Sequence, residues 1–70
     1  MTDAQFDALA SLMRMRAGSL RDAVRQHLVD GLSVPEAARS AGADYRGTSY
    51  AIKRALAALE LARTAAGAQQ

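Results

Sequence analysis

The chain contains no cysteine and only one histidine among its 70 residues. Without cysteine neither a disulfide nor a thiolate metal site can form, and a single histidine leaves little scope for nucleophilic chemistry. We therefore expect no metal site, no cofactor, no small-molecule ligand and no enzymatic activity. No apolar run approaches the roughly 20 residues of a membrane span, and the N-terminus lacks the basic and apolar segments of a secretory signal. These absences predict a cytoplasmic protein without a membrane partner.

Large apolar side chains are also scarce. Half of the residues are apolar, but 17 of them are alanines, which contribute little buried area each. A domain of this length buries only about 60% of its unfolded surface, so its core is thin. Self-association is the simplest further source of stability for such a chain. The composition therefore favours a homodimer.

The residues that are abundant predict an all-α fold, a small bundle of about four helices. Alanine, leucine and arginine dominate, and no segment alternates apolar and polar residues. The first helix is predicted to begin at Thr2, in a capping box with Gln5, and to end at Ala17-Gly18. Ser19 is predicted to cap the second helix, which ends near Gly31. The side chains of these two helices expected in the core are Phe6, Leu9, Ala10, Met13, Leu20, Val24 and Leu28.

Residues 33–54 have the parts of a helix-turn-helix. Ser33 and Glu36 form a second capping box at the start of a short helix, which Gly42 ends. The two helices of this motif cross closely, so the facing residues must be small, and the turn needs a residue that tolerates a positive φ, as Gly42 does. Asp44 is predicted to cap the next helix. The inward residues expected in the short helix are Val34, Ala37, Ala38 and Ala41.

The fourth helix is predicted to run from Tyr45 to about Arg63 and to complete a DNA-binding domain of residues 1–63. Residues 64–70 carry no large apolar group and are predicted to fray. At about 100° per residue, one face of the fourth helix is apolar and is expected to face the core. The members of this face are Thr48, Ile52, Ala55, Leu56 and Leu59.

The opposite face of the fourth helix carries hydrogen-bond donors and positive charge. Side chains of this kind suit duplex phosphates and guanine edges, and they stand in the N-terminal half of the helix, as in a recognition helix. From residue 39 to residue 54 four cations face a single acid, which is the charge pattern of a phosphate-binding surface. The residues predicted to contact double-stranded DNA are Arg39, Asp44, Tyr45, Arg46, Ser49, Tyr50, Lys53 and Arg54.

A protein-interaction module is the alternative interpretation of the same face. A small helical adaptor or inhibitor would use the basic surface on an acidic protein partner, and any amphipathic surface helix has this periodicity. A salt titration with random duplex separates the two hypotheses, because nucleic-acid binding weakens steeply as counterions are released.

The chain also resembles the TrfB-type (KorA-like) transcriptional repressors of plasmids over roughly residues 2–60. The matching positions, which fall in one register without gaps, are Thr2, Gln5-Phe6, Leu28-Val29-Asp30-Gly31, Gly42, Ser49, Ala51, Ile52, Arg54, Ala57-Ala58 and Glu60. The resemblance implies a dimer that reads a palindromic operator and represses transcription. It also implies that Tyr45, Tyr50 and Arg54 read bases.

Two positions depart from the family pattern. Tyr50 stands where the family has glutamine, and Tyr45 stands where it has arginine at the helix start. Tyrosine cannot pair bidentately with adenine as glutamine does, so we expect a different operator. Relatives can carry a separate C-terminal dimerisation region, whereas here we expect dimerisation through the helices present. A candidate dimer seam on the fourth helix consists of Ala58, Leu61 and Ala65.

Overall fold

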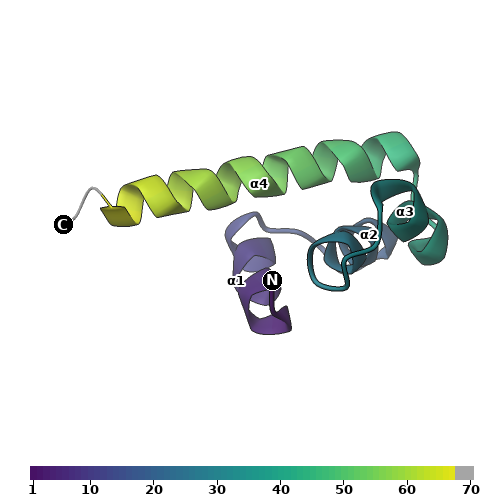
Figure 1. Ribbon diagram of the computed structural model, residues 1–70, viewed down its shortest axis with the longest axis horizontal. Helices are drawn as coiled ribbons and strands as arrows, with labels where there is room; N and C mark the ends of the chain where they lie inside the picture. Colours follow the sequence, from purple (N-terminus) through teal and green to yellow (C-terminus); the bar gives the residue numbers. More distant parts are fainter. Residues whose placement is uncertain (68–70) are drawn as a thin grey trace.

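A computed structural model describes residues 1–67 of the chain. Within that range it contains four helices and no strand, which confirms the predicted all-α class. The helices are α1 (Asp3–Leu12), α2 (Ser19–Leu28), α3 (Val34–Ala41) and α4 (Tyr45–Gly67). Figure 1 shows α4 as a long rod, with the three shorter helices all on one side of it. The molecule is accordingly elongated, with extents of 42 × 21 × 21 Å.

Three of the four helices begin at their predicted caps. Thr2 and Gln5 form the capping box of α1, in which the Gln5 backbone N–H donates to the Thr2 hydroxyl at 3.1 Å. Ser33 and Glu36 form the equivalent pair at α3. At α4 a carboxylate oxygen of Asp44 accepts a hydrogen bond from a first-turn backbone N–H 2.9 Å away. Local side-chain chemistry therefore sets these three starts.

The first helix ends earlier than predicted, at Leu12 rather than at Ala17-Gly18. Arg14 adopts a left-handed conformation with φ 56°, and the Met15 backbone N–H donates to the carbonyl of Ala10 at 2.9 Å. These are features of a Schellman ending, which glycine usually provides. An arginine in that position gives no sequence signal, so the pattern overestimated the helix. Residues 13–18 instead form a loop between α1 and α2.

The beginning of α2 also differs from the prediction. Ser19 is the first helical residue rather than the cap, and the cap position falls on Gly18, which has no side chain to accept a hydrogen bond. Leu20 is 41% exposed instead of buried, because the early end of α1 leaves the first turn of α2 uncovered. Val24 is fully buried as predicted, together with Ala23.

The core lies between α4 and the three shorter helices. Its fully or nearly fully buried side chains are Phe6, Leu9, Ala10, Val24, Ala51, Ile52 and Ala55. Met13, Leu28, Val34 and Leu59 pack around it in partly buried positions. Leu56 was predicted to join this core but is 47% exposed, because it stands at the edge of the apolar face, about 80° from Thr48 around the helix. Apart from the alanines, only Phe6, Leu9, Val24 and Ile52 fill this buried cluster.

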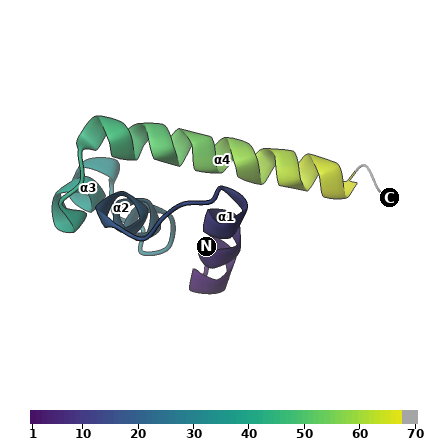
Figure 2. The same ribbon diagram turned by 180° about the vertical axis from the view of Figure 1, so that it is seen from behind.

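The C-terminal part of α4 extends beyond the other helices (Figures 1 and 2). The helix has 23 residues and continues to Gly67, past the predicted end at Arg63, so residues 64–67 of the predicted tail are helical. Residues 68–70 of that tail lie outside the described range. Every described residue from Glu60 onward is exposed. We refer to residues 60–67 as the overhang.

Ion pairs hold α1 against α2. Arg25 donates to the carboxylate of Asp3 at 2.7 Å and to that of Asp30 at 3.1 Å, and Arg21 lies 3.3 Å from the Asp7 carboxylate. The hydrogen bond from Arg25 is the main reason why the pKa of Asp3 is lowered. The Arg21 guanidinium also stands 5.6 Å from the ring centroid of Phe6, whose ring is buried. The contacts of Arg21 and Arg25 with Asp7 and Asp3 therefore join α2 to α1.

Candidate nucleic-acid interface

A tight left-handed turn joins α3 to α4. Gly42 has φ 73° and ψ 29°, as its predicted role requires, and the Ala43 backbone N–H donates to the carbonyl of Ala38 at 2.8 Å. Ala37 and Ala38 are buried, as predicted, so that α3 lies close to its neighbours. The short helix, the left-handed glycine and the capped long helix that the sequence predicts are therefore all present.

The N-terminal half of α4 is two-faced. Ile52 and Ala55 are buried, whereas Arg46 and Lys53 on the opposite face are exposed. Tyr50 is 65% exposed on the same outer face. The predicted division into a core face and a basic outer face is confirmed for these residues. Any surface that approaches α4 from outside the bundle meets cationic and hydroxyl groups first.

The remaining predicted contact residues flank this face. Tyr45 is exposed at the first position of α4, Ser49 is half-buried, and Arg39 is exposed in the last turn of α3. Asp44 is exposed, but one carboxylate oxygen is already bound to the α4 backbone, so its role in the structure is that of a helix cap. Placing Asp44 directly on DNA would bring its negative charge against phosphate.

Arg54 and Tyr50 lie one helical turn apart and interact. The Arg54 guanidinium stands 5.9 Å from the centroid of the Tyr50 ring, within the range of a cation–π contact. Such a contact restricts the directions in which a long arginine side chain points. The two residues therefore form one unit on the flank of α4.

The cations of this surface keep their charge available. Within residues 1–67 the ion pairs engage only Arg21 and Arg25, on the α1–α2 side of the molecule. The exposed cations on α3 and α4 have no carboxylate within salt-bridge distance in that range. Those at the α3–α4 turn and in the N-terminal half of α4 are Arg39, Arg46, Lys53 and Arg54, and Arg63 lies further along α4 in the overhang.

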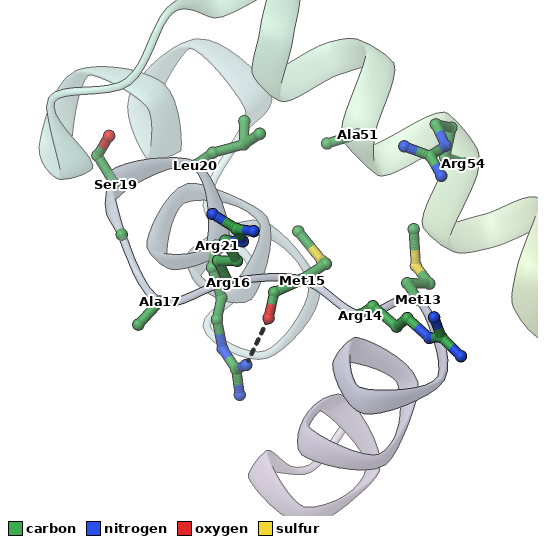
Figure 3. A pocket seen from close by; sticks show the side chains of 11 residues that line it. Met13, Arg14, Met15, Arg16, Ala17, Ser19, Leu20, Arg21, Ala51 and Arg54 are labelled. Carbon is green, nitrogen blue, oxygen red and sulfur yellow. Dashed lines mark hydrogen bonds between the residues drawn. The ribbon is translucent and has the colours of Figure 1, made fainter.

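The structure brings further arginines, from outside residues 33–54, to the edge of this surface. Arg14 and Arg16 from the loop and Arg21 from α2 line a cavity together with Arg54 of α4 (Figure 3). Their basic character is visible in the sequence, but their position beside α4 depends on the early end of α1. No local sequence pattern gives that proximity.

The candidate dimer seam is only partly open. Ala58 packs against the core in a half-buried position, so it is not available as a free seam residue. Leu61 is 71% exposed and Ala65 is exposed, both in the overhang. The apolar surface that remains for a partner is therefore nearer the C-terminal end of α4 than predicted.

Comparisons with protein-family models, with curated proteins and with solved structures found no match to this chain. The resemblance to the TrfB-type repressors thus stays a prediction. In the described part of the chain no group of histidine, cysteine and acidic residues is arranged to hold a metal ion. None of the four described helices combines the length and the apolar character needed to cross a membrane.

Proposed function

We propose that the protein is a cytoplasmic transcriptional regulator that binds DNA through a helix-turn-helix and acts as a homodimer. The observation that carries this proposal is the outer face of α4, where exposed cations without carboxylate partners follow a short helix and a left-handed glycine turn. In this motif the second helix enters the major groove and presents its N-terminal residues to base edges. In this protein the second helix of the motif is α4.

The outer face divides into base-reading and phosphate-binding residues. A major groove about 12 Å wide accepts one helix, with a phosphate strand along each side. Arg54, oriented by Tyr50, suits a guanine through the O6 and N7 acceptors. Tyr50 offers one hydroxyl and a ring edge, which suit a phosphate or a thymine methyl. Arg46 and Lys53 are assigned to the phosphate backbone.

The overhang supports a dimer formed with a second copy of the chain. It exposes Leu61 on a helix that no other part of the described chain covers. Beside it lies a groove of about 560 Å³ with a mainly apolar lining that includes Leu12, Leu28 and Leu59. In a two-fold arrangement the overhang of each copy would contact the same surface of the other. A dimer of this kind suits a palindromic operator.

The role as a repressor rests on the resemblance to the TrfB-type proteins. That resemblance also favours a plasmid-type operator with two equivalent halves. Because Tyr50 and Tyr45 replace the glutamine and arginine of the family, the operator is expected to differ in sequence from those that the family reads.

The proposal is tested by selecting bound duplexes from a random pool and sequencing them. We expect a palindromic consensus, and binding that weakens steeply with salt. Lys53→Ala should weaken binding to operator and to random duplex by a similar factor. Absence of duplex binding at about 50 mM salt would refute the proposal and favour an acidic protein partner.

Base reading is tested with operators changed one base pair at a time. Arg54→Ala is expected to relax discrimination at one position of each half-site, by about 1–3 kcal/mol. Tyr50→Gln is expected to shift preference towards adenine at the base pair that it faces, whereas Tyr50→Phe should alter affinity only modestly. A uniform loss for Arg54→Ala on all operators would place Arg54 on the backbone instead.

A further inference from the structure

A cavity of about 390 Å³ opens between the loop of residues 13–18, the first turn of α2 and the middle of α4 (Figure 3). Four arginines contribute to its wall, namely Arg14, Arg16, Arg21 and Arg54, and none of the described residues that line it is acidic. The apolar part of the lining includes Met13 and Met15, which extend towards α4 in Figure 3 and pack against the core. The cavity therefore has a fixed apolar floor and a cationic rim.

The arginines of this rim are not equivalent. Arg21 is already engaged, because it donates to the Asp7 carboxylate and to the Met15 carbonyl, each at 3.3 Å. Arg14 and Arg16 are exposed and take part in none of the ion pairs found within residues 1–67. The charge available to a ligand comes from these two loop arginines and from Arg54.

The backbone at Arg14 supports a role for its side chain. This residue adopts φ 56°, a conformation that favours glycine and that costs energy for other residues. The equivalent position after α3 is occupied by Gly42, which has φ 73°. An arginine at such a position is unfavourable for the turn itself, and strained positions often mark functional sites.

The cavity is continuous with the proposed DNA face. Arg54 belongs to both, since it contacts the Tyr50 ring on the outer face and also lines the cavity. Ala51 lies on the same flank of α4 but nearer the core, and it lines the cavity as well. A duplex that accepts α4 in its major groove has a phosphate strand on each side of that helix. The strand on the Ala51 flank would pass the mouth of the cavity.

We infer that Arg14 and Arg16 form a second DNA-backbone contact, which holds the phosphate strand on the Ala51 flank of α4. This inference rests on the proposed function. Figure 3 shows the two loop arginines apart from each other rather than directed at one point. Diverging guanidinium groups suit successive phosphates of a polymer, whereas a single small anion needs donors that converge.

The test is the salt dependence of binding of Arg14→Asn and Arg16→Gln to a random duplex. Asparagine tolerates the left-handed conformation, so Arg14→Asn removes the charge and keeps the turn. Each lost phosphate contact should reduce the slope of log Kobs against log salt by about 0.9. The loss of affinity between 50 and 200 mM salt should then be about 3.5-fold smaller than in the wild type. Base preference on the selected operator should not change.

The control is Arg63→Gln, which removes one exposed arginine away from the cavity. Because Arg63 lies in the overhang and lines the groove proposed for the partner copy, analytical ultracentrifugation must first show that this variant keeps the wild-type mass. Slopes for both loop variants equal to that of the control would overturn the inference. Lys53→Ala, measured in the same series, separates the two proposals. If Lys53→Ala lowers the slope and the loop variants do not, only the second contact fails. If wild-type protein does not bind duplex at all, both fail.

A free anion in the same cavity is the remaining outcome. Calorimetric titration of the wild type with inorganic phosphate distinguishes it from a backbone contact. Saturable binding of phosphate that Arg14→Asn abolishes, together with an unchanged salt slope on duplex, would identify a small-anion site and overturn the inference. Absence of saturable phosphate binding, together with the reduced slope, is the result expected for a DNA-backbone contact.

Discussion

Replacing Gly42 by alanine isolates the cost of the left-handed turn between α3 and α4. A Cβ atom at Gly42 would have no other atom within 4 Å, so the substitution causes no clash. The cost arises from the backbone, because φ 73° is unfavourable for a residue with a side chain by roughly 1–2 kcal/mol. Alanine also reduces the conformational entropy of the unfolded chain, which offsets about 0.4–1 kcal/mol of this destabilisation. The net destabilisation expected is about 1 kcal/mol.

The assay is thermal unfolding followed by circular dichroism. For a domain of this size 1 kcal/mol corresponds to a fall in Tm of about 4–8 °C. Gly42→Val should cost more than Gly42→Ala, because β-branched residues resist this conformation further. Arg14→Gly should have the opposite effect, since it removes the same strain after α1.

Gly47→Ala is the matched control, because the chemical change is the same and the residue lies inside α4. A Cβ at Gly47 would meet its nearest neighbour, Oδ2 of Asp44, at 3.6 Å, which is an ordinary contact. Alanine should therefore stabilise the helix by about 0.5–1 kcal/mol. The reasoning would be refuted if Gly42→Ala raised Tm as Gly47→Ala is expected to do.

Three further outcomes are expected. Thr48 is fully buried and its hydroxyl has no hydrogen-bond partner in the described chain, so Thr48→Val should raise the free energy of unfolding by about 1 kcal/mol; an unchanged or lower value in urea titration would contradict this. Hydrogen bonds from Ser33 lower the pKa of Glu36. The ionised Glu36 carboxylate therefore stabilises the fold fully above the unfolded pKa of about 4.3, and this stabilisation is lost as pH falls through the lower folded pKa. The free energy of unfolding of the wild type, measured relative to that of Glu36→Gln, should decline in that pH window. Leu61→Asp should convert the proposed dimer into a folded monomer in analytical ultracentrifugation, and a dimeric mass unchanged from wild type would remove Leu61 from the interface.

Sequence patterns predicted the parts of the fold that depend on neighbouring residues. The capping boxes at Thr2 and Ser33 and the cap at Asp44 each involve contacts within three residues along the chain. Burial along the N-terminal half of α4 also followed from helical spacing, because the partners of Ile52 lie on one side only. These features need no knowledge of tertiary structure.

The errors occurred where tertiary contacts or an unusual residue decide the outcome. Arg14 ends α1 in a left-handed conformation that is usually adopted by glycine. Because the end of α1 was predicted too late, the loop of residues 13–18 was missed and the start of α2 was misplaced. Leu20 and Leu56 have the spacing of core residues, but too few elements are present to cover them. For the same reason the cationic cavity could not be predicted, since it brings Arg54 beside a loop more than thirty residues earlier in the chain.

The continuity of α4 has a consequence for the operator. One unbroken helix carries both the outer face around Lys53 and the overhang around Leu61, so the number of intervening residues fixes their separation and rotational phase. Each residue adds 1.5 Å and about 100°. In the proposed dimer, inserting one residue after Glu60 would rotate the overhang relative to the outer face by about 100°, turning the second copy away from its half-site. Inserting seven would restore the phase to within about 20° and move the copies apart by about 10 Å for each helix. The length of α4 would thus set the distance between the two DNA-binding surfaces of the proposed dimer, and the half-site spacing of its operator is expected to follow that length.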